Sequence, residues 1–143
     1  MDVPCVFCSA VAGLSEPGVC LAVNRDFVVF PALHQKPRNR GHMLLVPADH
    51  LGGIADVPPE SAADMLAALQ VVTKAVKAAF DASGTTVRLN LGPPAQDVLH
   101  LHWHIIPRYV DDDFNYVRSS EMPLSDRLQQ TARLAQHLAG THE

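Results

Sequence analysis

The segment HLHWHIIPR at residues 100–108 constrains the fold of this chain more than any other stretch. Histidine occupies every second position, and large apolar residues lie between the histidines. Successive side chains of a β-strand point to opposite faces of a sheet, so the alternation predicts a strand over 99–106. One face of that strand would carry three imidazoles, those of His100, His102 and His104. The other face, toward the core, would carry Leu101, Trp103 and Ile105.

Three roles fit such a row of imidazoles: a solvated strand face, a metal site, or a nucleophile with phosphate-binding neighbours. Same-face neighbours on a strand have Cα atoms about 6.5–7 Å apart, so two imidazoles can bind one zinc ion. His100 and His104 are about 13 Å apart along a strand and cannot easily share that ion. A metal site therefore leaves at least one histidine for another function, such as attack on phosphorus.

The composition excludes several classes of protein. The chain has 143 residues, the length of one domain, and 48% of them are hydrophobic, enough for a substantial core. Its formal net charge of -4 argues against a general nucleic-acid-binding protein. The first residues lack the pattern of a signal peptide, and no apolar run approaches the roughly 20 residues that span a bilayer. We therefore expect a cytoplasmic protein that binds neither nucleic acid nor a membrane.

Short apolar runs bounded by turn residues predict five strands. They cover residues 19–24, 27–33, 42–48, 85–91 and 99–106. A long helix is expected over 58–84, where apolar residues recur every three or four positions between a Pro pair and Gly84 at the C′ position. The apolar residues of this stripe are Met65, Leu69, Val72, Val76 and Phe80.

A second helix is expected within 124–138, where Ser125 suits the N-cap position. The apolar residues at helical spacing in this segment are Leu124, Leu128, Ala135 and Leu138. Strands joined mostly by short loops, together with one long helix and this C-terminal helix, predict an α+β fold with a five-stranded antiparallel sheet.

The three cysteines of the chain include one close pair, Cys5 and Cys8, and a separate Cys20. An odd number with one close pair does not indicate a disulfide framework. The pair fits two buried small side chains, a redox pair, or half of a zinc site. A zinc site needs two more ligands, and His50 and one histidine of the 100–104 row are candidates.

Four segments of the chain resemble motifs of one known family. HLHWHII is similar to a His-φ-His-φ-His-φ-φ motif, where φ is apolar. CVFCSAVAG, RGHMLLVPADH and LNLGPPAQDV are similar to segments that precede this motif in the same order. Together they resemble the histidine-triad (HIT) superfamily of nucleotide hydrolases and transferases, in particular its bacterial zinc-bearing branch near diadenosine-polyphosphate hydrolases.

The resemblance implies a fold consistent with the pattern-based prediction. It implies one HIT-like domain over 1–143, with a core at 5–108 and a C-terminal extension at 109–143. It also implies a homodimer and a small-molecule nucleotide substrate.

The resemblance further implies a role for each matched polar residue. His102, the middle histidine, would be the nucleophile that forms a nucleotidyl-histidine intermediate, and His104 would contact the phosphate. The residues implied to bind substrate beside them are His42, Asn90 and Gln96. The residues implied to hold a structural zinc ion are Cys5, Cys8, His50 and His100.

Two positions depart from the family pattern. Asp97 stands where many members carry a Ser or Thr that donates to the leaving group, and an ionised carboxylate there repels phosphate unless it turns away. His34 stands where an Asp or Asn usually binds the ribose hydroxyls, which an imidazole can also hydrogen-bond. Both are therefore expected to be substrate-binding positions with altered preference.

Four functions stay open on the sequence. The first is hydrolysis of a dinucleoside polyphosphate or nucleoside phosphoramidate through His102. The second is nucleotidyl transfer through the same intermediate. The third is a nucleotide-binding signalling protein with little turnover. The fourth is a metal-dependent hydrolase that uses the histidine row directly, and it would lose activity at once with a chelator.

Overall fold

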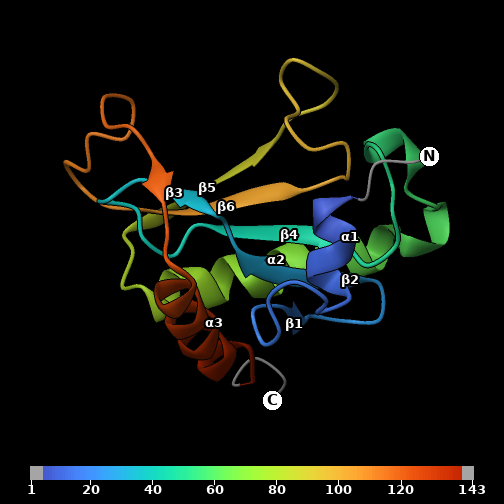
Figure 1. Ribbon diagram of the computed structural model, residues 1–143, viewed down its shortest axis with the longest axis horizontal. Coiled ribbons are helices and arrows are strands. Elements are labelled where there is room, and N and C mark those ends of the chain that lie inside the picture. The colour runs from blue at the N-terminus through green and yellow to red at the C-terminus, as the bar shows by residue number, and fades with distance from the viewer. Residues whose placement is uncertain (1–4, 140–143) are drawn as a thin grey trace.

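The computed structural model describes residues 5–139 and shows a central antiparallel sheet with helices on both faces (Figure 1). The sheet has five strands, in the spatial order β1 (Leu21–Ala22), β2 (Phe27–Pro31), β4 (Met43–Pro47), β6 (Trp103–Arg108) and β5 (Gly84–Leu89). A second, two-stranded sheet pairs β3 (His34–Gln35) with β7 (Ser120–Glu121). This architecture confirms the predicted α+β fold, and the small second sheet is an addition that the sequence patterns did not show.

One face of the large sheet packs against two helices, α2 (Ala62–Ala79) and α3 (Leu124–Ala139). A short 3-10 helix (Pro59–Ser61) leads directly into α2, as the prolines at its start favour. The predicted apolar stripe of α2 faces this core: Val72 and Val76 are fully buried, and Met65 and Leu69 pack at its border. Among the described helices, none is both long and apolar enough to cross a membrane.

The opposite face is covered at one end only, by α1 (Val6–Val11), which crosses in front of β2 and β4 in Figure 1. The sequence patterns did not predict this helix. It is short, and Cys5 caps it by accepting a hydrogen bond from the backbone N–H of Cys8. Phe7 packs from α1 onto a second apolar cluster that includes Phe30 and Leu44. The rest of this face, over β4, β6 and β5, is left for polar side chains.

Gly41, in the Gly-His pair before β4, has a reason to lack a side chain. Its φ of +103° lies in the region that favours glycine, and a Cβ there would lie 2.5 Å from a ring carbon of Phe80. Phe80 follows α2 and is itself buried. Glycine therefore lets the chain pass over the end of α2 just before His42.

The histidine segment is a strand only in part, which corrects the prediction for 99–106. β6 begins at Trp103 and runs to Arg108. The reason is that this segment pairs with β4 and β5 only from residue 103 onward. The backbone N–H of Leu101 donates instead to the carbonyl of Leu51 in a loop. The alternation nevertheless holds, because Ile105 and Trp103 pack in the core beside α2, whereas His102 and His104 line a cavity on the opposite face.

Two predicted helix ends are wrong. Gly84 is the first residue of β5, and the left-handed residue after α2 is Asp81, with φ +51°. Ser125 lies inside α3, which begins one residue earlier. The leucines at 124 and 128 are exposed, and α3 instead buries a partly polar face made of Arg127, Gln130, Thr131, Leu134 and Leu138. Arg127 contributes through a bidentate ion pair with Glu16, with both N–O distances 2.7 Å.

Asp112 holds the segment that follows β6 against the rest of the fold. Its buried carboxylate accepts hydrogen bonds from Arg108, Asn39 and the backbone N–H groups of Tyr109 and Phe114. The hydrogen bonds from Arg108, above all, hold the pKa of this carboxyl well below its usual range. The division of the chain into a core and an extension at residue 108 stays a prediction, but the two parts are joined here by a dense polar network.

We expect Asp112→Ala to lower the free energy of unfolding by about 2–4 kcal/mol, because it leaves several buried donors without an acceptor. The low pKa means that the carboxylate stabilises the fold at neutral pH, and that this contribution is lost as the pH falls below about 4. Urea unfolding followed by circular dichroism measures both effects. Asp113→Ala is the matched control, since the side chain of Asp113 is more than half exposed and its carboxylate pairs with exposed Arg38. Equal losses in the two variants would contradict the role given to Asp112.

Candidate active site and metal centre

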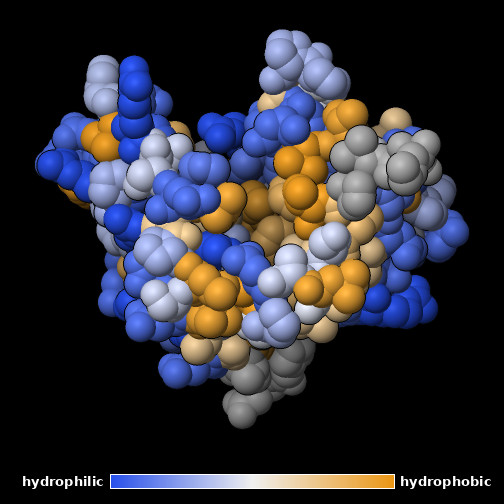
Figure 2. Space-filling view, viewed as in Figure 1, coloured by the Kyte–Doolittle hydropathy of each residue, from blue (hydrophilic) through white to orange (hydrophobic). Residues whose placement is uncertain are grey.

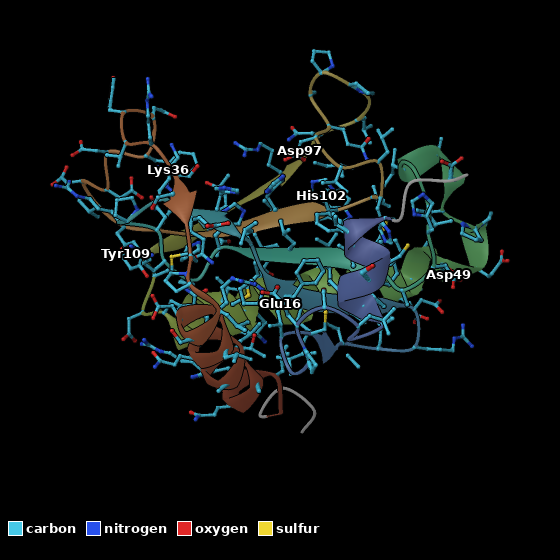
Figure 3. The ribbon with its side chains drawn as sticks, in the orientation of Figure 1. Glu16, Lys36, Asp49, Asp97, His102 and Tyr109 are labelled. Atoms are coloured by element: carbon cyan, nitrogen blue, oxygen red, sulfur yellow. The ribbon has the colours of Figure 1, made fainter. Side chains whose placement is uncertain are left out.

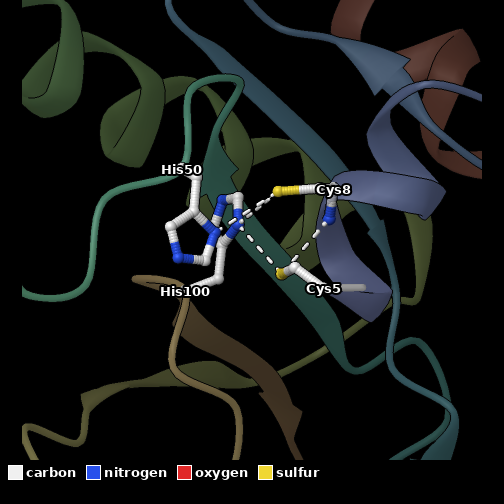
Figure 4. Close-up of side chains that lie close together, drawn as sticks. All are labelled: Cys5, Cys8, His50 and His100. Carbon is white, nitrogen blue, oxygen red and sulfur yellow. Dashed lines mark hydrogen bonds between the residues drawn. The ribbon is translucent and has the colours of Figure 1, made fainter. Parts of the chain in front are cut away.

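The structure gathers the four expected metal ligands at one end of the sheet (Figure 4). Cys5 and Cys8 come from the start of α1, His50 from the loop after β4, and His100 from the segment before β6. One ligand atom from each lies within 4.8 Å of every other. Residues separated by up to 95 positions in the sequence thus meet at a single point.

The spacing of these ligand atoms fits a tetrahedral zinc ion. His100 Nδ1 lies 3.6 Å from the Sγ atoms of both Cys5 and Cys8, and His50 Nδ1 lies 3.3 Å from Cys8 Sγ. Zinc bound at its usual distances to sulfur and nitrogen separates two such ligands by about 3.5 Å. His100 Nε2 donates to the carbonyl of Pro47 at 2.9 Å, so the lone pair of the neutral ring points from Nδ1 toward the cysteines. Two thiols and two imidazoles are a donor set that zinc prefers.

His102 lies next to this cluster and its ring orientation is fixed. Its Nδ1 donates to the carbonyl of His100 at 2.8 Å. Because a carbonyl can only accept, the neutral ring carries its proton on Nδ1 and a free lone pair on Nε2. Nε2 lies 3.3 Å from a carboxylate oxygen of Asp97, whose side chain is 78% exposed. The ring itself is 2% exposed and contacts Phe7 edge to face, with the ring centroids 5.0 Å apart.

His104 and His42 form a neutral pair beside His102. His42 Nε2 and His104 Nδ1 are 3.0 Å apart and share one hydrogen bond. Burial, reinforced by the nearby histidines and Arg88, lowers the pKa of His42 to about 3 and that of His104 to about 4. Both rings are therefore uncharged at neutral pH. The second ring nitrogen of His104, Nε2, is buried without a hydrogen-bond partner among the described residues.

Two cavities meet at these histidines. The first, which we call the apolar cavity, has a volume of about 340 Å³ and lies between α1 and the histidine row. Figure 2 shows apolar atoms gathered around a hollow on this face of the molecule. The residues that line the apolar cavity are Val6, Phe7, Ala32, Leu33, His34, His42, Leu44, Asp97, Val98, His102 and His104. Its volume suits a small organic ligand.

The second, which we call the cationic cavity, has a volume of about 400 Å³ and extends from His104 toward β3 and β7. It shares His34, His42, Asp97 and His104 with the apolar cavity. The sequence analysis missed its other lining residues, which are Lys36, Asn39, Arg88, Ile106, Phe114, Asn115 and Ser119. The alternation along 85–91 does place Arg88 opposite the apolar side chains of Val87 and Leu89, so a signal for one of them was present.

Two predicted substrate-binding residues lie outside both cavities. Gln96 is buried and its amide is fully used: it accepts from the N–H of Gly92 and donates to the carbonyls of Gly52 and Val98. It therefore braces the loop after β5, and contact with phosphate would require one of these bonds to break. Asn90 is half-buried directly after β5, and its side chain makes no hydrogen bond to the described residues. Their role in binding substrate stays a prediction.

Comparison with known proteins identifies the family. The model of the HIT domain matches residues 19–111, which is more than half of the chain. The chain belongs to the HIT domain family. Members of this family include nucleotide hydrolases and phosphorylases. The family assignment confirms the resemblance that the histidine row and its flanking segments indicated.

Two relatives and one solved structure are similar to this HIT protein. An uncharacterized HIT-like protein of Mycobacterium tuberculosis is 36% identical over 105 residues, which are 73% of this chain and 71% of the relative. The adenylylsulfatase HINT3 of Arabidopsis thaliana is 31% identical over 105 residues, but the matched part is only 52% of its length. A crystal structure of a zinc-bound histidine triad family protein from Mycobacterium smegmatis superimposes with a TM-score of 0.77 at 32% identity, over 96% of this chain and 94% of the other. This structure and the Cys5–Cys8–His50–His100 cluster together suggest that the HIT protein binds zinc.

We expect one zinc ion per chain, and we expect Cys8→Ser to weaken zinc binding by about 100-fold or more, because a hydroxyl is a poor substitute for a thiolate ligand. Elemental analysis and a competition titration with a chromophoric chelator measure stoichiometry and affinity. Cys20→Ser is the matched control, because Cys20 donates to the carbonyl of Ala10 and lies outside the cluster. Wild-type protein that takes up no zinc, or equal zinc affinity in both variants, would show that the cluster is not a metal site.

Proposed function

We propose that this HIT protein is a nucleotide phosphohydrolase that cleaves a dinucleoside polyphosphate or related nucleotide conjugate through a nucleotidyl-histidine intermediate on His102. The observation that carries the proposal is the hydrogen bond from His102 Nδ1 to the carbonyl of His100. It directs the lone pair of Nε2 into the apolar cavity, toward the exposed carboxylate of Asp97. A neutral imidazole with an oriented lone pair is a nucleophile at physiological pH.

The nucleoside would bind in the apolar cavity, where the ring of Phe7 and the side chains of Leu33 and Val98 offer apolar contact. His34, at the mouth of both cavities, is placed to hydrogen-bond a ribose hydroxyl. With the nucleoside there, the α-phosphate lies beside His102 and His104.

His104 would bind a phosphate oxygen. Its Nε2 has no protein partner, and the hydrogen bond with His42 decides which nitrogen of the ring carries the proton. If His42 Nε2 donates to His104 Nδ1, the proton of neutral His104 resides on Nε2 and can be donated to phosphate. This donor is preorganised, so it strengthens as charge develops on the phosphoryl oxygens in the transition state.

The first step would form a bond between His102 Nε2 and the α-phosphorus and break the bond from that phosphorus to the leaving group. In the second step water attacks the phosphorus, and the proton of water passes to a base while the bond to Nε2 breaks. A nucleotidyltransferase would use the same first step and a different acceptor. Asp97 must turn away from Nε2 before phosphate arrives, which its exposed position at 78% of side-chain area permits.

The metal would have a structural role in this scheme. Two thiolates and two imidazoles make a closed set of four ligands, with no position left for water or substrate. The ion would tie α1 to the segment that carries His102 and so hold Phe7 against the nucleophile. Removal of zinc by a chelator should then inactivate the protein only as fast as it unfolds. Assembly as a homodimer stays a prediction.

We expect His102→Ala to lower the hydrolysis of diadenosine tetraphosphate by about a thousandfold or more while the fold is retained, because the nucleophile is lost. Release of nucleoside monophosphate, followed by chromatography, measures the rate. Mass spectrometry of the acid-labile adduct after rapid quenching should show the nucleotidyl group on wild-type protein.

His137→Ala is the matched control, because it removes an imidazole from α3, outside both cavities. Equal turnover by the His102 and His137 variants would sink the assignment of the nucleophile. Tight nucleotide binding by the wild type with no turnover would favour the binding function instead.

A further inference from the structure

The cationic cavity has a charge that the proposed chemistry at His102 does not explain. Its charged lining residues are Lys36, Arg88 and Asp97, two cations and one carboxylate. His42 and His104 add no charge at neutral pH, since burial lowers the pKa of both rings to about 3 and about 4. Figure 3 shows Lys36 at the far end of the sheet face from Asp97 and His102. The end of the cavity away from the nucleophile is therefore positive.

Arg88 is a free cation directly beside the histidine row. It lies opposite His104 in the register of β5 with β6, on the same face of the sheet. Its guanidinium makes no hydrogen bond or ion pair with the described residues, although it is close enough to the two neutral histidines to lower the pKa of each. An unpaired guanidinium that lines a cavity is a ready donor to a carboxylate, phosphate or sulfate group.

Lys36 is held in place but keeps donors free. Its ammonium donates to the carbonyl of Phe114 and lies 4.3 Å from the centre of the Phe114 ring. An ammonium has three donors, so two of them can point into the cavity. No described acidic side chain pairs with it.

The wall behind Lys36 comes from residues beyond the matched HIT segment. Phe114, Asn115 and Ser119 line the cavity, whereas the family model ends at residue 111. This wall is fixed by the Asp112 network and by pairing of β7 with β3. The C-terminal segment therefore supplies one wall of a cavity whose two cations, Lys36 and Arg88, lie within the matched HIT segment.

We propose that the cationic cavity binds an oxyanion leaving group, such as sulfate or the distal phosphates of a polyphosphate, and that Arg88 and Lys36 are its binding residues. The inference rests on the proposed function and narrows its substrate class. With the nucleoside in the apolar cavity and the α-phosphate at His102 and His104, the rest of the substrate extends into the cationic cavity.

The chemistry of the leaving group favours a substrate that releases an oxyanion over a phosphoramidate, which releases an amine. When the lone pair of His102 Nε2 forms the N–P bond, the P–O bond breaks and its electron pair leaves on the oxygen. A sulfate or phosphate oxygen carries that charge as a stable anion and needs no proton, but fixed cations stabilise it. A departing amine needs a proton instead, and the guanidinium of Arg88 does not give one up at neutral pH. The cationic cavity therefore offers two cations that stabilise an oxyanion leaving group, whereas an amine leaving group would require a proton donor.

The test compares three adenylyl compounds with different leaving groups: adenylyl sulfate, diadenosine tetraphosphate and adenosine phosphoramidate. Binding is measured by calorimetry in a His102→Ala background, where the compounds stay intact, and turnover is measured with His102 present. We expect Arg88→Gln and Lys36→Gln each to weaken binding of the two anionic compounds by about tenfold or more and to lower their turnover similarly. Binding of adenosine phosphoramidate should change by less than about threefold.

Arg25→Gln is the matched control, because it removes one exposed positive charge from the turn between β1 and β2, outside both cavities. Equal losses for all three compounds, or no loss for any, would overturn the anion site and leave the His102 assignment untouched. Selective loss of binding without any turnover by the wild type would support the anion site and overturn the hydrolase proposal.

Discussion

Each imidazole of the 100–104 segment has one ring nitrogen held by a neighbouring group, and this constraint determines what the other nitrogen can do. His100 donates from Nε2 to the carbonyl of Pro47, which directs Nδ1 to the cysteines. His102 donates from Nδ1 to the carbonyl of His100, which frees Nε2. His104 shares Nδ1 with His42 and leaves Nε2 unpartnered. Three identical side chains therefore acquire three different chemistries from the backbone and side chains that each one meets.

The metal cluster and the apolar cavity depend on the same short helix. α1 supplies Cys8 to the cluster, Phe7 to the contact with His102, and Val6 to the cavity wall. None of the residues of α1 is fully buried, so packing alone gives this helix little stability. Binding of a metal by the cysteines would add the missing free energy, and it would do so where the cavity wall needs to be rigid. A structural ion can thus shape a substrate site without touching the substrate.

The sequence predicted what is local and repeated, and missed what depends on distant partners. The two-residue period of the histidine row was enough to predict a strand, and the cysteine spacing was enough to predict half of a metal site, because both patterns are set by neighbouring residues. The full set of four ligands came from the resemblance to the HIT family, since it joins residues up to 95 positions apart. The strand start at Trp103 was missed because the backbone of Leu101 bonds a distant loop instead of β4. The buried face of α3 was missed because it is polar, and its residues are buried through partners such as Glu16, more than a hundred positions away. The cationic cavity was missed for the same reason, since its wall comes from two distant segments that meet through the pairing of β3 with β7 and through the Asp112 network.

Asp97 lines both the apolar cavity and the cationic cavity. Its carboxylate lies 3.3 Å from the nucleophilic nitrogen of His102, in the place that a phosphate oxygen would need. An anionic substrate must therefore displace a negative charge before it can react, and the free energy for this must come from attraction elsewhere. Lys36 provides that attraction from the far end of the cationic cavity, and Arg88 provides it from the position opposite His104. A substrate without an anionic leaving group does not extend to Lys36, so it meets the repulsion of Asp97 with less compensation. Asp97 beside the nucleophile and the two cations of the cavity would then together select substrates by the charge of the leaving group.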